Sequence, residues 1–184
     1  SSDLWVLVQE HTVEQAGGGG VERPHLPHRF VAQNSRGETA SIIAIIKTQG
    51  SDTKLVAQMQ PLYEAKGLDP LDLGGVTVPP LVTQIGDGEN GGVMMNEFPE
   101  AYLQGMRDAS ESETPALNVT EYLEHLFAVG VKEEQLPAVV PVLQHRIWDR
   151  FEKGAGPEAL AATIKALQQE DDQFHMEGGS WTMD

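Results

Sequence analysis

The apolar positions of this chain fall into two patterns, short continuous runs and helical spacings. Residues 4–8 form a continuous apolar run, which is typical of a strand buried on both faces. The largely apolar runs at 29–32 and 40–46 are separated by the polar, glycine-bearing residues 34–37, and this arrangement predicts a β-hairpin. A further run at 81–85 predicts a central strand.

Apolar residues at helical spacing predict two helices in the middle of the chain. The first begins at residue 51 or 52, is kinked or split by Pro61, and ends at Gly67. The second spans residues 94–106 and is interrupted or restarted at Pro99. The second helix directly follows the predicted central strand, so strands and helices alternate along this region.

Two more helices are predicted in the last third of the chain. One opens at Asn118, where Glu121 three residues later completes a capping-box pattern, and ends at Gly130. The other starts at Pro157, a residue that suits the first turn of a helix. We expect residues 135–151, which contain two prolines, to be irregular or to form short helices.

Length and charge limit the classes of protein that this sequence can represent. With 184 residues the chain can bury one core, so we expect a single α/β domain over residues 1–184. The formal net charge of -16 argues against nucleic-acid binding, which needs a basic surface. No apolar run is long enough to span a membrane, and the start of the chain carries Asp3 without a basic segment. We therefore expect a cytoplasmic protein without membrane contacts.

The chain has no cysteine, so disulfides, thiolate zinc sites and cysteine nucleophiles are excluded. Histidines offer little evidence of a metal site. His25 and His28 flank prolines in a predicted loop, and we expect His125 and His145 at the surface or at the edge of the core. We therefore expect no metal and no cofactor.

The strongest candidate for chemistry follows the predicted central strand. Asp87 and Glu89 are separated by one glycine and followed by Asn90, so their side chains would lie at the carboxyl edge of a sheet, where α/β folds build active sites. Glycoside hydrolysis uses one carboxylic acid to protonate the leaving oxygen and a second carboxylate to attack or assist. We favour Asp87 as the acid/base, with Glu89 and Asn90 orienting it or contacting sugar hydroxyls.

Two alternatives apply to the same segment. Glu89 could instead cap the following helix in an acidic turn without catalytic function. A helix-loop-helix calcium site is excluded, because the fifth and twelfth positions of the loop would be Gly91 and Phe98, which offer no side-chain oxygen.

Two further segments carry candidate substrate contacts. Glu10 and His11 directly follow the first predicted strand and would share the sheet edge with Asp87 if the strands are parallel. His11 could equally be a solvated loop residue. Trp181 stands in a glycine-rich tail and could stack against a sugar ring, or it could be buried in the core.

The chain resembles glycoside hydrolase family 57, the retaining α-glucan family of amylases, 4-α-glucanotransferases and branching enzymes. It is most similar to family members of unassigned specificity. The resemblance covers nearly the whole chain and rests on four segments: residues 5–12 (WVLVQEHT), 45–50 (IIKTQG), 87–92 (DGENGG) and 174–181 (FHMEGGSW).

The resemblance implies a portion of a (β/α)7-type barrel with parallel strands, an inserted β-hairpin and several helices. It implies that Asp87 is the acid/base aspartate at the end of a barrel strand and that Glu10 and His11 lie on the sugar-facing rim. Better-known members carry Phe-Gly where this chain has Gly91-Gly92, so a substrate-facing aromatic is missing. The family's nucleophilic glutamate precedes the strand matched by residues 4–8, so this chain is expected to be an incomplete barrel that lacks the nucleophile.

Three hypotheses follow from the sequence. In the first, the chain is part of a retaining α-glucan hydrolase or transferase and is inactive alone. In the second, it is a carbohydrate-binding or self-associating module that pairs with a second copy or a complementing chain. In the third, it is a structural α/β protein without sugar chemistry.

Overall fold

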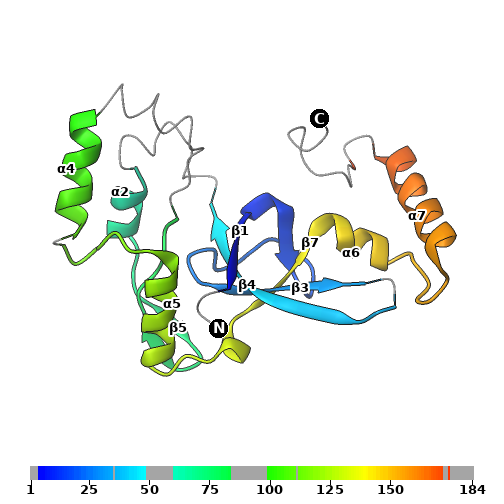
Figure 1. Cartoon of the computed structure of the whole chain (residues 1–184), viewed down its shortest axis with the longest axis horizontal. Coiled ribbons are helices and arrows are strands. Elements are labelled where there is room, and N and C mark those ends of the chain that lie inside the picture. The colour runs from blue at the N-terminus through cyan, green and yellow to red at the C-terminus, as the bar shows by residue number, and fades with distance from the viewer. Residues whose placement is uncertain are drawn as a thin grey trace.

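The computed structural model describes residues 4–34, 36–48, 60–83, 99–110, 112–171 and 174. Side chains at positions 60 and 99–102 are outside this description. Strands and helices alternate irregularly along the chain (Figure 1). The strands are β1 (Trp5–Gln9), β2 (Val13–Gln15), β3 (His28–Gln33), β4 (Thr39–Lys47), β5 (Leu71–Leu73), β6 (Val76–Val78) and β7 (Ala138–Pro141). The helices are α2 (Gln60–Lys66), α4 (Pro99–Ser110), α5 (Val119–Ala128), α6 (Val142–Trp148) and α7 (Pro157–Glu170), with 3-10 turns η1 (Glu10–Thr12) and η2 (Glu133–Gln135).

Five strands form one mixed sheet in the order β1-β4-β3-β7-β2. The β1–β4 and β3–β7 pairs are parallel, whereas the β3–β4 and β2–β7 pairs are antiparallel. The predicted first strand and the predicted hairpin are therefore confirmed as β1 and as β3–β4. The expectation of parallel strands holds for two of the four pairs only, and the described residues form no closed barrel.

Several strands differ from the sequence-based expectation. Residues 138–141 form β7, although the two prolines around them predicted irregular structure or short helices, and the hairpin β5–β6 was not predicted. The described part of the predicted central strand, residues 81–83, belongs to no strand. Hydrogen bonds to two other segments hold it instead: the Leu81 N–H donates to the His25 carbonyl at 2.9 Å, and the Thr83 hydroxyl donates to the Ile46 carbonyl at 3.2 Å.

The local signals for helix ends are confirmed where the structure describes them. The Glu121 carboxylate accepts a hydrogen bond from the Asn118 N–H at 2.8 Å, as a capping box requires. Gly130 follows α5 with φ of 103°, a conformation that favours glycine. Pro61 stands in the first turn of α2, where its missing N–H leaves no helical hydrogen bond unmade. The predicted start of that helix, residues 51–59, lies outside the described residues.

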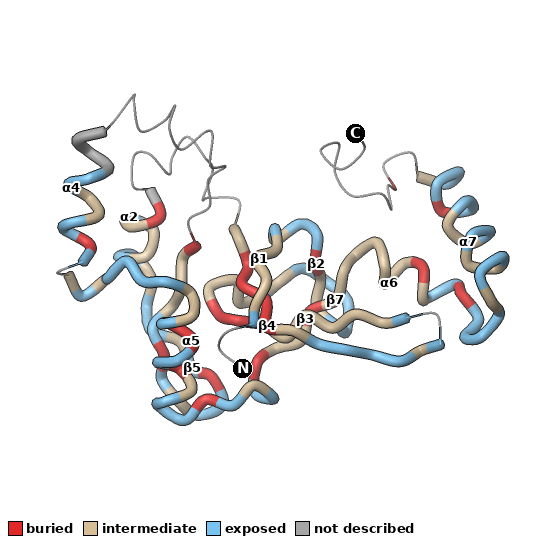
Figure 2. Tube along the Cα trace, in the orientation of Figure 1, coloured by how far each residue is buried: buried red, intermediate tan, exposed pale blue. Residues whose placement is uncertain are grey.

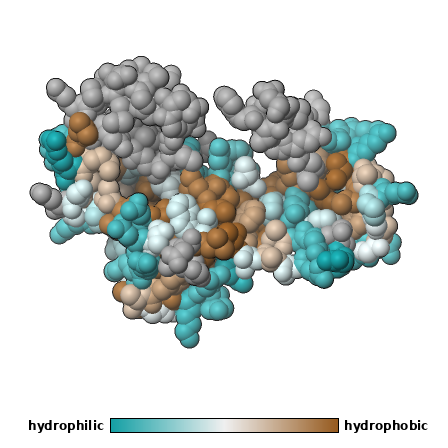
Figure 3. Space-filling model, in the orientation of Figure 1, coloured by the Kyte–Doolittle hydropathy of each residue, from teal (hydrophilic) through white to brown (hydrophobic). Residues whose placement is uncertain are grey.

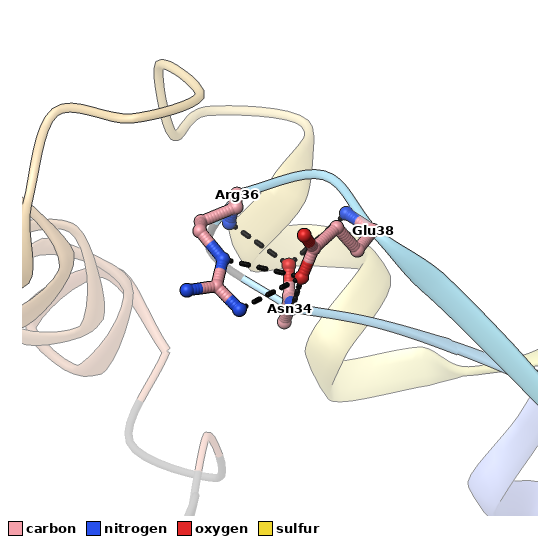
Figure 4. Close-up of polar contacts among 3 residues, drawn as sticks. All are labelled: Asn34, Arg36 and Glu38. Carbon is pink, nitrogen blue, oxygen red and sulfur yellow. Dashed lines mark hydrogen bonds and ion pairs between the residues drawn. The ribbon is translucent and has the colours of Figure 1, made fainter.

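The turn between β3 and β4 is organised by a small polar network at its tip (Figure 4). The Asn34 side-chain oxygen accepts hydrogen bonds from the backbone N–H groups of Arg36 at 2.9 Å and Glu38 at 3.0 Å. The Glu38 carboxylate in turn accepts from the Asn34 amide at 2.7 Å and from the Arg36 guanidinium. These hydrogen bonds, first from Asn34 and then from Arg36, lower the pKa of the Glu38 carboxyl. The network fixes the hairpin register and lies on an exposed tip.

The core divides into three clusters (Figure 2). The largest lies between one face of the sheet, α5 and the β5–β6 hairpin, and its sheet residues Ile43 and Ile45 lie beside Trp5 and Leu7 of β1. Alternate residues such as Ile46 point to the opposite face and pack in a smaller cluster with Val13 and Val139. The third cluster joins α6 and α7. Figure 1 shows α5 to the left of β1 and the α6–α7 pair to its right.

The helices in the part of the chain that the structure describes include none with the length and apolar character to cross a membrane.

Candidate functional site

The carboxyl ends of the parallel strands β1 and β4 define one edge of the sheet. Val8 pairs with Ile46 and Gln9 with Lys47, so the two strands end side by side. Glu10 and His11 follow β1 directly in the turn η1. The hydrogen bond from Thr83 to the Ile46 carbonyl brings the segment that leads toward Asp87 to this same edge. Side chains from three separate segments therefore lie close to the carboxyl end of β1.

An open hollow of about 500 Å³ lies next to this edge. Its polar lining consists of Glu10, His11 and Glu14. The other lining residues are apolar or lack a side chain: Val13, Gly19, Gly20, Val21 and Val142. Carboxylates can accept hydrogen bonds from the hydroxyl groups of a ligand, and apolar side chains can contact its C–H surfaces.

Glu14 is held by a histidine from a distant part of the chain. Nδ1 of His145, on α6, is hydrogen-bonded to Oε1 of Glu14, on β2. The other ring nitrogen of His145, Nε2, lies 3.5 Å from Oδ1 of Asp149, which follows the last residue of α6. The side chains of His145 and Glu14 are 31% and 24% exposed, so this pair remains accessible to solvent.

The remaining described histidines have structural roles or are exposed. His28 is buried, and its Nδ1–H donates to the Leu26 carbonyl at 2.8 Å. Burial lowers the pKa of His28 to about 4. His25 lies 3.3 Å from the Leu81 carbonyl and 3.8 Å from a Glu64 carboxylate oxygen. Among the described residues no group of three or more histidine, aspartate or glutamate side chains is arranged to hold a metal ion.

The structure brings together two of the six predicted site residues. Glu10 and His11 both line the hollow. Asp87, Glu89, Asn90 and Trp181 lie outside the described residues. Glu14 and His145 were not predicted as site residues, because they are 131 positions apart and no local pattern links them.

Comparisons of this chain with models of protein families, with curated proteins and with solved structures find no match.

Proposed function

We propose that this chain forms part of a retaining glycoside hydrolase or glucanotransferase that acts on α-glucans. Asp87 is the acid/base in this proposal, and Glu10, His11, Glu89, Asn90 and Trp181 contact substrate. The parallel pair β1–β4 is then a portion of a (β/α)7-type barrel, and the attacking carboxylate comes from polypeptide outside this sequence.

The observation that supports this proposal best is the arrangement at the carboxyl end of β1. Glu10 and His11 line a hollow there, at the end of a parallel strand pair, which is where barrel and open α/β folds bind substrates. Glu10 offers a carboxylate that accepts hydrogen bonds from sugar hydroxyls.

The contact between Thr83 and Ile46 adds a second, independent argument. Thr83 is 7% exposed and is hydrogen-bonded at the end of β4, beside the strand that leads to Glu10. Asp87 follows Thr83 by four positions in the sequence, a separation that a fully extended chain covers in about 14 Å. An acid/base at position 87 is thus compatible with a substrate bound at Glu10 and His11.

Binding is the primary test, because turnover in this proposal needs a second carboxylate from elsewhere. Titration calorimetry with maltohexaose should detect binding, and cellohexaose should bind more weakly. Glu10→Gln removes the charged acceptor and should weaken maltohexaose binding by about 10- to 150-fold, since a hydrogen bond to a charged group contributes roughly 1.5–3 kcal/mol. Glu124→Gln removes the same charge from an exposed position on α5 and serves as the matched control.

Equal binding of maltohexaose by the wild type and Glu10→Gln would contradict the proposed role of Glu10. No binding of any α-glucan would contradict the proposed substrate. If the purified chain hydrolyses a glucan and Asp87→Asn abolishes the activity, the attacking carboxylate lies within this chain and that part of the proposal is wrong.

A second candidate is a non-catalytic carbohydrate-binding or self-associating module, and the position of β1 favours it. Among the described strands, β1 is an outermost strand of the five-stranded sheet, and it pairs with β4. Apolar side chains reach the surface in the middle of the molecule in Figure 3, where Figure 1 draws β1, and Leu4 just before the strand is 66% exposed. Edge strands of this kind pair with other chains.

Light scattering across a range of protein concentrations tests self-association. In this second reading the wild type forms dimers, and Leu4→Lys makes it monomeric because a charge at an edge strand opposes pairing. Leu103→Lys, which changes a residue of α4 that is 48% exposed and lies apart from β1 in Figure 1, is the control and should leave the dimer intact. A monomer at all concentrations would rule this reading out.

A further inference from the structure

We infer that Glu14 is an additional ligand-binding carboxylate, positioned by His145, and that the hollow beside it takes a polyhydroxylated ligand. This inference rests on the proposed function, since it concerns the same hollow. It assigns a binding role to Glu14 and a positioning role to His145, two residues that no sequence motif identified.

The geometry leaves one oxygen of Glu14 for a ligand. Glu14 lies on the edge strand β2, where its backbone pairs with Val140. Its Oε1 is hydrogen-bonded to Nδ1 of His145. Because one oxygen is fixed by the histidine, the carboxylate is held in a single orientation, and Oε2 can accept a hydrogen bond from a ligand hydroxyl.

His145 is itself held from several directions. Asp149 faces its second ring nitrogen at 3.5 Å. The neighbouring residue Gln144 accepts a hydrogen bond from the Gln33 N–H on β3 at 3.0 Å, and Arg146 pairs with Asp171 at 2.8 Å. Three consecutive residues of α6 are thus fixed to three different partners, so the imidazole has little freedom to move away from Glu14. A carboxylate that is oriented before binding loses less entropy when a ligand arrives.

The lining of the hollow supports a polyhydroxylated ligand. Glu10 and Glu14 repel anions and accept hydrogen bonds from hydroxyl groups. Val13, Val21 and Val142 form an apolar wall that suits the C–H face of a sugar ring. Gly20 contributes backbone only, and a Cβ built there meets no atom within 4 Å, so ligand atoms can approach the chain closely at this position.

Glycine substitutions test whether the hollow is the binding site. Gly20→Val adds a side chain to the wall of the hollow, whereas Gly17→Val adds the same side chain to the same loop away from it. Neither glycine has a positive φ and both have open space, so both variants should fold with unchanged thermal stability. With maltotriose as the probe, Gly20→Val should weaken binding by about tenfold or more, and Gly17→Val should leave it unchanged.

Substitutions at positions 14 and 145 test the positioning role. Glu14→Gln should weaken maltotriose binding by about tenfold or more. His145→Ala should weaken it less, and His145→Asn should restore it, because the asparagine amide can donate to Glu14 from nearly the same position as Nδ1. In the Glu14→Gln background, His145→Ala should have no further effect on affinity. A purely structural role for His145 would instead lower affinity and thermal stability equally in both backgrounds.

The outcomes separate this inference from the proposed function. If Glu10→Gln abolishes binding while Gly20→Val and Glu14→Gln bind as the wild type does, the inference is overturned and the proposed function stands. If no α-glucan binds, both are overturned. Spermidine is the cationic probe: binding of spermidine tighter than that of maltotriose, and lost in Gly20→Val, would assign the hollow to cations and overturn the polyhydroxylated ligand.

Discussion

The burial of His28 makes the stability of this protein depend on pH in a calculable way. His28 begins β3 opposite Ala44, is 2% exposed, and donates from Nδ1–H to the Leu26 carbonyl at 2.8 Å. Burial disfavours the charged imidazolium, Arg23 opposes it further, and together they lower the pKa of His28 to about 4 from the ordinary 6.5. The hydrogen bond to Leu26 acts in the opposite direction but does not compensate for burial.

The direction of the effect follows from the two pKa values. Between pH 6.5 and about 4 the unfolded chain binds a proton at this histidine that the folded chain does not bind. The contribution of His28 to stability is therefore complete above pH 6.5 and is lost as the pH falls toward 4. The loss reaches about 2 kcal/mol at about pH 5 and about 3 kcal/mol over the whole interval.

Urea denaturation at about pH 7.5 and about pH 5 measures this loss. Carboxylates also titrate in this range, so the wild type must be compared with His28→Asn, which keeps a donor for the Leu26 carbonyl but does not titrate. The variant should be less stable at the higher pH because it leaves a small cavity. Its stability should fall by about 2 kcal/mol less than that of the wild type between the two pH values.

His125→Asn provides the matched control, since it removes an exposed histidine on α5. The control should show the same pH dependence as the wild type. If His28→Asn also loses stability in parallel with the wild type, to within about 0.5 kcal/mol, then His28 does not carry the proton that links folding to pH, and the reasoning from its burial is wrong.

Three further predictions concern the core and the backbone. Leu126→Ala, at a residue with 0% exposure in the main cluster, should lower the free energy of unfolding by about 2–5 kcal/mol in urea denaturation. Tyr122→Phe removes the hydroxyl that donates to the Pro79 carbonyl at 2.7 Å and should cost about 1–3 kcal/mol by the same measurement, because the carbonyl loses its partner. Gly130→Ala should lower the free energy of unfolding by roughly 1–2 kcal/mol, because Gly130 has a φ of 103° that alanine rarely adopts. Gly17→Ala is the control: Gly17 has equally open space and no positive φ, so the free energy of unfolding should not change. Equal effects in the two variants would show that backbone conformation is not the cause.

The sequence predicted those features that depend on residues close to one another along the chain. The capping box of Asn118 and Glu121 joins positions three apart, and Gly130 ends α5 through its own backbone angles. The continuous apolar run of β1 and the polar turn between β3 and β4 are likewise local signals. Each of these features depends on a few neighbouring residues, so the local sequence pattern is enough to predict it.

The sheet as a whole could not be predicted in the same way. β2 is three residues long and half-buried beyond Val13, so it carries no apolar pattern of useful length. β7 lies in an apolar stretch, but Pro137 before it and Pro141 at its end argue against a strand. They become strands because they pair with each other, and β7 also with β3, across more than a hundred residues. Conversely, the run at 81–85 predicted a strand, but its described part, residues 81–83, is hydrogen-bonded to His25 and Ile46 and stays outside the sheet.

The same distinction between local and long-range contacts applies to the candidate site. The sequence by itself determined that Glu10 and His11 follow a strand, because strand and turn are adjacent in the chain. Only the tertiary structure decided that Glu14, which lines the hollow, meets His145, since β2 reaches α6 through its pairing with β7. The physical reason is that a contact between residues 131 positions apart is set by the packing of whole elements, and no pattern of neighbouring residues records it.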